Sequence, residues 1–184
     1  IGRATDNDIV IPDVLASRMN LFAVKEYPRR GLDVQAQKVF EYLVATPQLR
    51  NPDTLYNYAS FLRKKGEEER AQSLISMAIE EKKKRIAGGT ENGTAYYRMA
   101  NFYASLSRRA EEQRALERAI ELYAAEIRDL ERGIRSGEMI KKVAETRLRY
   151  AYDEIADAYE RTGNGESATK YRALLEGLGG APGK

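Results

Sequence analysis

The side chains that could carry chemistry are mainly carboxylates, because the 184-residue chain contains no histidine and no cysteine. This composition excludes Ser-His-Asp triads, thiolate nucleophiles, disulfides and zinc sites made of Cys and His. Asp153 and Asp157 are four residues apart with Glu154 between them, so a helix would place both aspartates on one face. Paired carboxylates can act as acid and base or hold a metal. Nothing nearby completes such a site, so we expect a solvated helix face, no catalytic residue, no metal and no cofactor.

Basic residues gather in runs at 63–65, 82–85 and 108–109. Such runs can contact the phosphates of nucleic acid or of anionic lipid. However, the chain has 31 Lys and Arg against 28 Asp and Glu, for a net charge of +3. A balance this close does not indicate a nucleic-acid partner. We interpret the runs as helix ends, where cations complement the helix dipole.

The elements that must position these residues are helices, as the stretch 52–85 shows. Counted from Pro52, its apolar residues fall at spacings of three and four on either side of Gly66, which predicts two helices joined by a turn. Arg63–Lys65 before the turn and Glu67–Glu69 after it match the dipoles of the two helices. A hairpin this small needs stacked copies to bury its apolar face. The residues on that face are Leu55, Tyr58, Ala59, Leu62, Ala71, Ile75 and Ala78.

This spacing resembles the tetratricopeptide repeat family, although Leu55 stands where the family usually has Trp and Ala59 where it usually has Gly. The pattern recurs from Ser17, Gly93 and Arg149. The four starts are 35, 41 and 56 residues apart, against a family period of about 34, so the array is irregular. At the turn position the other three copies carry Gly31, Ser107 and Gly163. The resemblance implies an all-α fold, a right-handed α-solenoid of antiparallel helical hairpins with about four repeat units.

We expect three segments along the chain: an N-terminal arm at 1–11, a helical repeat domain at 12–176 whose first helix begins at Pro12, and a disordered tail at 177–184. No run approaches the roughly 18 apolar residues of a membrane span, so no integral membrane segment is expected. No signal peptide is visible. The absence of cysteine fits a soluble protein of either the cytoplasm or the periplasm, with a lean toward the periplasm.

The resemblance also implies a peptide-binding groove, because partners of this family lie along the first helix of each repeat. Tyr56, Tyr97 and Tyr150 would project into this groove, where a tyrosine offers a large contact area and a polar tip. The alternative is that these tyrosines pack against neighbouring helices or a terminal arm. The residues implied for the groove are Asp53, Tyr56, Ser60, Arg63, Lys64, Tyr97, Asn101, Ser105, Tyr150, Asp153 and Asp157.

Some members of this family hold a peptide C-terminus in a carboxylate clamp. Asn57 and Arg98 could take part in one, but Leu21 and Lys25 stand where the clamp requires Lys and Asn. We therefore expect no such clamp in this chain.

The N-terminal string from Ile1 to Asn20 resembles the phosphothreonine-binding motif of forkhead-associated domains. Gly2, Arg3, Asn7, Ser17 and Arg18 match that motif, whereas Asn20 replaces its His. These domains are β-sandwiches, so a strand at residues 8–11 would favour this interpretation and a helix there would remove it.

Together these patterns predict a non-catalytic scaffold or adaptor that holds an extended segment or helix of a partner protein in its groove. The alternative is a regulatory protein that reads phosphopeptides through the N-terminal string. An enzyme would require a pocket of convergent polar groups, which the sequence does not indicate. Helical repeats also associate through their end faces, so a homo-oligomer is a further expectation.

Overall fold

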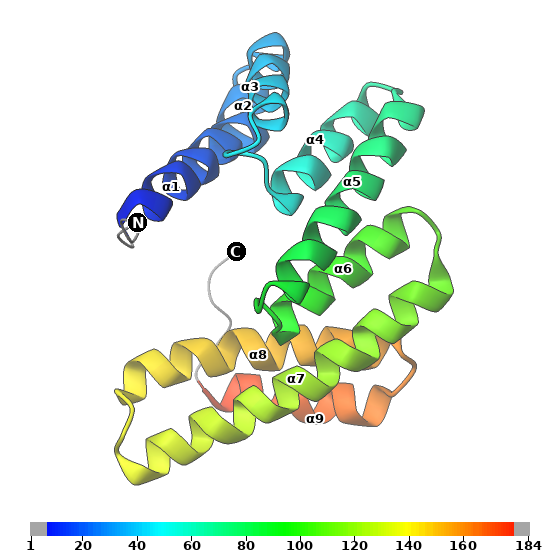
Figure 1. Ribbon diagram of the computed structural model, residues 1–184. Helices are drawn as coiled ribbons and strands as arrows, with labels where there is room; N and C mark the ends of the chain where they lie inside the picture. Colours follow the sequence, from blue (N-terminus) through cyan, green and yellow to red (C-terminus); the bar gives the residue numbers. More distant parts are fainter. Residues whose placement is uncertain (1–6, 179–184) are drawn as a thin grey trace. The chain divides into compact units, whose positions relative to one another are not determined.

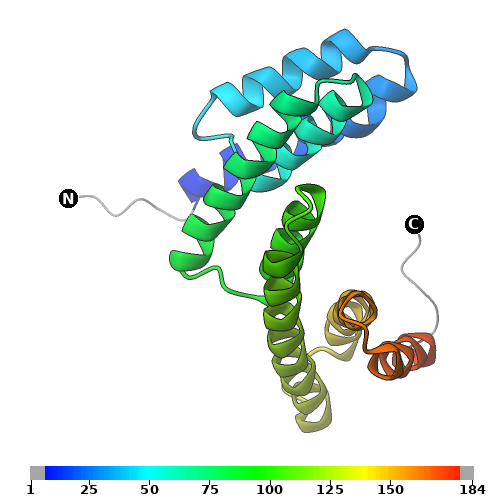
Figure 2. The same cartoon turned by 90° about the vertical axis from the view of Figure 1, so that its right-hand side faces the viewer.

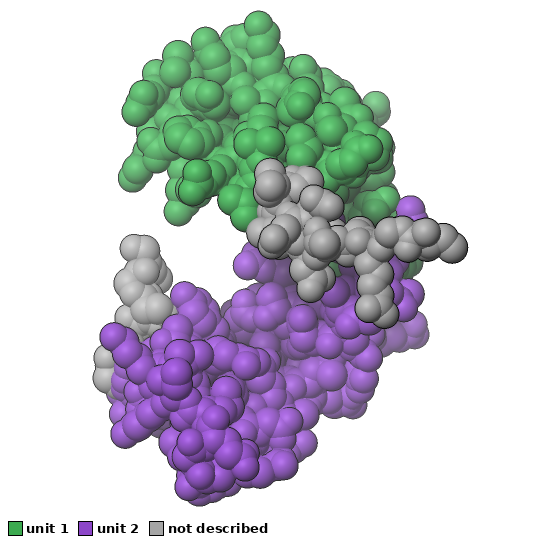
Figure 3. All heavy atoms as spheres, turned by 60° about the vertical axis from the view of Figure 1, so that its left-hand side comes forward, with its two compact units in different colours: residues 1–83 green, residues 84–184 purple. Residues whose placement is uncertain are grey.

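The computed structural model describes residues 7–178, with side chains from Val14 onward. Every regular element in this range is helical, which confirms the expected all-α class. The chain divides into two compact units, residues 1–83 and 84–184 (Figure 3). The expected repeat domain at 12–176 is therefore shared between two units, and each is described by itself.

Unit 1 begins with a long helical segment, returns through one helix, and continues into a helical hairpin (Figure 1). The helix α5 ends just beyond the unit boundary. The elements are α1 (Asn7–Leu21), the π-helix η1 (Phe22–Glu26), α2 (Tyr27–Arg29), α3 (Asp33–Ala45), α4 (Pro52–Lys64) and α5 (Glu68–Ala87).

The first helix corrects two expectations. It begins at Asn7 and not at Pro12, so residues 7–11, which we expected in an extended arm, are helical. The stretch 8–11 is thus helix where the forkhead-associated interpretation required a strand, and that interpretation has no support. Of the five residues that match its motif, Gly2 and Arg3 lie outside the described residues, and Asn7, Ser17 and Arg18 lie on α1.

The π-helix η1 has a local cause in Pro28. A proline ring has no N–H, so Pro28 cannot bond the carbonyl of Val24 as an α-helix requires. Just before it, the N–H of Tyr27 donates to the carbonyl of Phe22, five residues back. This wider turn lets the chain stay helical up to the proline.

A cluster of three aromatic rings joins α3 to α4 in the core of unit 1. The ring of Phe40 on α3 stacks on Tyr58 of α4 with 5.2 Å between centroids, and Phe61 lies 5.6 Å from Phe40. The N-terminus of α4 is capped by Asn51, whose side chain accepts the N–H of Thr54 over 2.8 Å. All seven residues predicted for the shared apolar face of this hairpin are buried, which confirms its register.

Unit 2 contains four further helices in sequential antiparallel contact, and Figure 2 shows α8 and α9 end-on beside each other. Tyr123, Ile127 and Leu130 of α7 pack against Leu148 and Ile155 of α8. The helix that we expected from Glu138 begins at Lys141. The helices are α6 (Gly93–Ser105), α7 (Arg109–Ser136), α8 (Lys141–Arg161) and α9 (Gly165–Gly177). Of the expected tail, residues 179–184 lie outside the described residues.

The turn position of the repeat template has the same backbone conformation in all four copies. Gly31, Gly66 and Gly163 have φ values of +68°, +80° and +83°. Ser107 replaces the glycine in the third copy and still has φ of +57°. Since the left-handed region favours glycine, Ser107 holds a strained conformation that the hairpin geometry imposes.

Helix lengths in unit 2 are unequal. Helix α6 has 13 residues, whereas α7 has 28 and α8 has 21. Thr94, at the start of α6, lies beside Tyr123 of α7 and Glu154 of α8. The antiparallel course of α6 and α7 therefore carries the end of α7 and the start of α8 beyond the N-terminus of α6.

Among the described helices, none combines the length and the apolar character that a membrane crossing requires.

Candidate functional site

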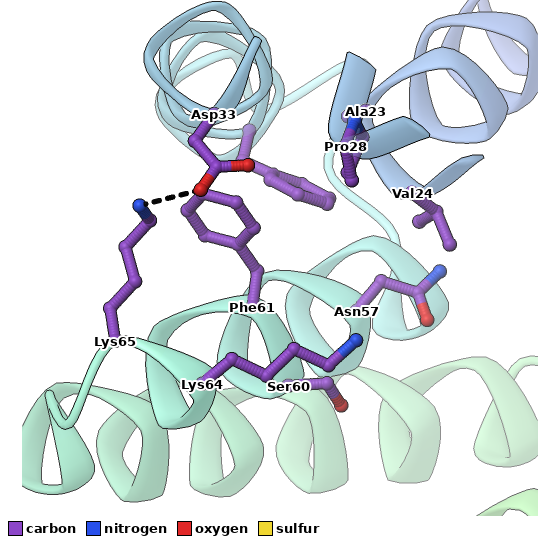
Figure 4. Close-up of a pocket in the computed structure, with 10 residues that line it drawn as sticks. Ala23, Val24, Pro28, Asp33, Asn57, Ser60, Phe61, Lys64 and Lys65 are labelled. Atoms are coloured by element: carbon purple, nitrogen blue, oxygen red, sulfur yellow. Dashed lines mark hydrogen bonds and ion pairs between the residues drawn. The ribbon is translucent and has the colours of Figure 1, made fainter. Parts of the chain in front are cut away.

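A pocket of about 240 Å³ lies within unit 1, between the π-helix region and α4 (Figure 4). One wall comes from the segment that Pro28 distorts, and the other comes from the exposed side of α4. The lining residues are Ala23, Val24, Pro28, Asp33, Phe40, Asn57, Ser60, Phe61, Lys64 and Lys65.

The floor and one wall of the pocket are apolar. Ala23 and Phe40 are buried beneath it, and the ring of Phe61 forms part of the floor. Val24 is 40% exposed and borders the opening, which Figure 4 shows opposite the side chains of α4. An apolar side chain of a ligand could therefore leave water here without losing hydrogen bonds.

The opposite wall is polar and comes from a single helix face. Asn57, Ser60 and Lys64 are spaced by three and four residues on α4, so their side chains project together toward the pocket (Figure 4). The hydroxyl of Ser60 donates to the carbonyl of Tyr56 over 3.0 Å, which leaves its oxygen able to accept a bond. Asn57 makes no hydrogen bond to another described residue and offers both its donors and its acceptor.

The two lysines of this pocket differ in their partners. The ammonium of Lys65 pairs with Asp33 over 3.0 Å and lies 5.1 Å from the centre of the Phe61 ring. Lys64 forms no ion pair with any described side chain. The pocket therefore presents one cation whose charge the described residues leave uncompensated.

The other groove residues expected on α4 lie outside the pocket. The guanidinium of Arg63 forms an ion pair of 2.9 Å with Glu68 across the turn to α5. Asp53 is exposed in the first turn of α4, and Tyr56 is half-buried. Of the five residues predicted on this helix, the structure brings Ser60 and Lys64 into one cavity.

In unit 2, the expected groove residues of α6 and α8 bond to each other. The hydroxyl of Tyr97 donates to Oδ2 of Asp157 over 2.8 Å. The guanidinium of Arg161 donates to Oδ1 of Asn101 and to Oε1 of Glu112, each over 2.7 Å. Tyr97, Asn101 and Asp157 thus connect α6 with α8, which is the packing alternative considered for the tyrosines.

The same contacts fix the charge of two groups. Burial, reinforced by the hydrogen bond to Asp157, raises the pKa of Tyr97, so its phenol stays neutral. Burial by itself lowers the pKa of Arg161, but the hydrogen bond to Glu112 and the nearby charges of Glu112 and Asp157 together outweigh it, so the net shift is upward. The guanidinium also lies 5.7 Å from the centre of the Tyr97 ring, within cation–π range.

A second set of contacts joins α6, α7 and α8. The hydroxyl of Tyr123 on α7 donates to Oε2 of Glu154 on α8, and Thr94 on α6 donates to the same oxygen over 3.3 Å. Burial, and then the bond to Glu154, raises the pKa of Tyr123. Glu154 therefore helps to hold the three helices together. We expected a solvated face at 153–157, but of its acidic residues only Asp153 is exposed without a hydrogen bond to another helix.

The remaining expected groove residues of unit 2 take no part in these contacts. The hydroxyl of Ser105 donates to the carbonyl of Asn101 over 3.0 Å. Tyr150 is 57% exposed, and Asp153 is exposed as well. Among the residues with described side chains, no group of acidic residues is arranged to hold a metal ion.

Sequence reasoning overlooked Val24 and Pro28, which form the pocket wall opposite α4. The repeat template places Val24 at an inward position, yet the residue is partly exposed beside the cavity. The signal that could have identified this wall is Pro28, which interrupts the helical pattern three residues before Gly31.

Comparison with known proteins yields only distant likenesses. No family model matches the chain, and no curated protein matches it. A crystal structure of MamA is 21% identical, covering 89% of this chain and 77% of its own, with a TM-score of 0.39. A crystal structure of BtubC from P. vanneervenii is 19% identical, covering 100% of this chain and 71% of its own, with a TM-score of 0.48. At these values the likenesses carry no information on a partner or an activity.

Proposed function

We propose that this chain is a non-catalytic protein-interaction scaffold that binds an extended segment of a partner protein. The observation that carries the proposal is the pocket of unit 1, where an apolar floor meets the polar face of α4 and the uncompensated charge of Lys64. The anchor of the partner would be an apolar side chain followed by an acidic group.

The size of the pocket favours a peptide side chain over a small-molecule ligand. Its volume of about 240 Å³ lies below the about 300–1,000 Å³ that is usual for sites enclosing a drug-sized molecule. One large apolar side chain fits such a volume, and the adjacent residues of an extended segment would continue along α4. Recognition of this kind combines a buried anchor with a polar rim.

The charges of the pocket favour an acidic neighbour for that anchor. Lys65 is already neutralised by Asp33, so Lys64 supplies the net charge. A carboxylate beside the anchor could accept bonds from Lys64 and from the amide of Asn57. Charge-assisted bonds of this type are about twice as strong as neutral ones.

The test uses a displayed library of random linear peptides, from which those that bind the full chain are selected. We expect enriched sequences that combine a large apolar residue with a nearby Asp or Glu. The selected peptides should bind at least about tenfold more weakly to the Lys64→Glu variant, because removal of a central interface contact commonly costs that much.

The matched control is Lys38→Glu, which makes the same charge change at an exposed site of α3 outside the pocket. This variant should keep the wild-type affinity. Selection of no consistent sequence, or equal loss of binding in both variants, would contradict the proposal.

A further inference from the structure

The polar wall of the unit 1 pocket offers different hydrogen-bonding groups at different points. It consists of Asn57, Ser60 and Lys64, which lie on one face of α4 (Figure 4). A lysine ammonium only donates, an amide both donates and accepts, and a hydroxyl can do either. What each side chain still offers, after its bonds within the chain are made, determines which part of a partner it can bind.

Ser60 offers an acceptor. Its hydroxyl proton is engaged, because it donates to the carbonyl of Tyr56 on the preceding turn over 3.0 Å, a bond that helical serines commonly make. The lone pairs of its oxygen are then the groups left for a ligand. An anion placed on this oxygen would be repelled, whereas an N–H would be bound. Every non-proline residue of a peptide carries such an N–H on its main chain.

This acceptor favours an extended partner over a helical one. In a helix, the main-chain N–H groups beyond the first turn are bonded within the helix itself. In an extended segment they have no such partner and can donate to Ser60. Ser60 is half-buried, so a ligand that covers its oxygen without bonding to it would bind more weakly.

The other two side chains offer donors on the same side of the pocket. Figure 4 shows the side chain of Lys64 extended along α4, so that its ammonium lies toward the amide of Asn57. Lys64 forms no ion pair with a described side chain, and Asn57 makes no hydrogen bond to one. A carboxylate has two oxygens and one negative charge, so it can accept bonds from both groups at once.

The charge of the pocket matches a carboxylate better than a phosphate. The charged residues in its lining are Asp33, Lys64 and Lys65, and the pairing of Lys65 with Asp33 over 3.0 Å leaves the single positive charge of Lys64. One carboxylate cancels this charge. A phosphorylated side chain carries a charge of about −1.5 to −2, and the excess would lie in the same pocket as the carboxylate of Asp33.

We infer that this pocket recognises an extended, unphosphorylated acidic segment through hydrogen bonds of opposite direction. Asn57 and Lys64 donate to the carboxylate of an Asp or Glu, and Ser60 accepts a main-chain N–H near it in the segment. The inference rests on the proposed function and specifies its ligand. Ser60 selects the extended backbone, and the single uncompensated cation selects a carboxylate over a phosphate.

The first test compares a carboxylate with a phosphate. The probe is a peptide from the library selection whose binding is lost in Lys64→Glu, and its contact residue is the Asp or Glu whose replacement by Asn or Gln weakens binding most. Fluorescence anisotropy compares this peptide with one that carries phosphoserine at the contact residue. We expect the phosphopeptide to bind at least about tenfold more weakly. A phosphopeptide that binds as tightly as the parent peptide, or more tightly, would overturn the inference.

The second test examines Ser60 with ester replacements in the same peptide. Replacing one peptide N–H at a time by an ester oxygen removes a donor without adding bulk. We expect one position near the acidic residue to lose about fivefold in affinity, and this loss to vanish in Ser60→Ala, which lacks the acceptor. The matched control is Ser76→Ala, because Ser76 makes the same bond to the carbonyl of Gln72 over 3.0 Å on α5, outside the pocket. This variant should bind the parent and ester peptides like the wild type.

The outcomes separate this inference from the function on which it rests. If peptides bind in a Lys64-dependent way but no ester position is sensitive, or the sensitivity persists in Ser60→Ala, the inference is wrong and the scaffold function stands. If the selection yields no peptide that depends on Lys64, the proposed function fails and the inference fails with it. Circular dichroism verifies that Ser60→Ala stays folded.

Discussion

The hydroxyl of Tyr97 donates a 2.8 Å hydrogen bond to Asp157, and this bond joins α6 to α8 across 60 residues of sequence. Arg161 extends the connection by bonding Asn101 and Glu112 and by covering the Tyr97 ring. The polar face of α6 that could have received a partner is therefore occupied by the chain itself. In unit 2 these groups stabilise the packing of three helices.

Removing the Tyr97 hydroxyl tests this structural role. Tyr97→Phe keeps the ring beneath Arg161 but removes the hydroxyl that donates to Asp157, which then keeps only its 3.5 Å ion pair with Arg161. We therefore expect unfolding to become easier by about 1–2 kcal/mol. Urea unfolding followed by circular dichroism measures the change. Tyr150→Phe removes an exposed hydroxyl from the same expected groove and should stay within about 0.5 kcal/mol. Equal effects of the two changes would argue against the role of the bond.

The local register of the helices could be predicted because it depends on neighbours in sequence. Leu55, Tyr58 and Leu62 repeat at helical spacing, and all three are buried. The turn position was recognisable as well, even where Ser107 replaces glycine, because the surrounding pattern places it between two helices. These features follow from local geometry and require no knowledge of distant contacts.

The fate of the groove residues could not be predicted because it depends on contacts between distant segments. Tyr97 and Ser60 occupy equally polar positions of their helices, yet one bonds Asp157 across 60 residues and the other lines a pocket. The sequence shows that α7 and α8 are long, but not which face of α8 the shorter α6 covers.

The strained turn at Ser107 predicts a stabilising substitution. A left-handed conformation costs a non-glycine residue about 1–2 kcal/mol, whereas glycine adopts it freely. Ser107→Gly should therefore raise the free energy of unfolding by about 0.5–1 kcal/mol, after the greater unfolded-state freedom of glycine is deducted. Ala104→Gly, at an exposed helical position of α6, should have the opposite sign. Chemical denaturation of both variants decides the matter, and a destabilised Ser107→Gly would contradict the assigned strain.

Gly93 and Gly165 form a natural matched pair, because each opens a helix directly after a capping asparagine. A Cβ on Gly93 would lie 2.5 Å from Cδ1 of Tyr123, whereas one on Gly165 would meet no atom within 4 Å. Tyr123 is buried and bonded at its hydroxyl, so the ring cannot easily yield. We expect Gly93→Ala to destabilise unit 2 by about 1–3 kcal/mol.

The Gly165→Ala variant should be neutral or stabilising by up to about 1 kcal/mol, since alanine restricts the unfolded chain. Thermal unfolding of the two variants side by side provides the comparison. If both shifted the melting temperature in the same direction and by the same amount, close packing of Tyr123 on the α6 N-terminus would be refuted.

Buried phenols predict a loss of stability at alkaline pH. Burial and the bond to Glu154 raise the pKa of Tyr123 above the 10.0 of a free tyrosine. Since the folded pKa is the higher one, the unfolded chain releases this proton first as the pH rises. The stabilisation is therefore complete below pH 10 and is lost progressively above it, at up to about 1.4 kcal/mol per pH unit for each such tyrosine.

Urea unfolding of the wild type and of Tyr123→Phe between pH 8 and about pH 11 measures how much Tyr123 contributes to the loss of stability at alkaline pH. Tyr123→Phe should lower stability at pH 8, because Glu154 loses a donor, and should also flatten the decline above pH 10. Lysines titrate in the same range, so the informative quantity is the difference in slope between variant and wild type. Tyr42→Phe, at an exposed position of α3, is the control for removing a phenol outside this network. A Tyr123→Phe slope as steep as that of the wild type would show that the phenol is not held neutral by its surroundings.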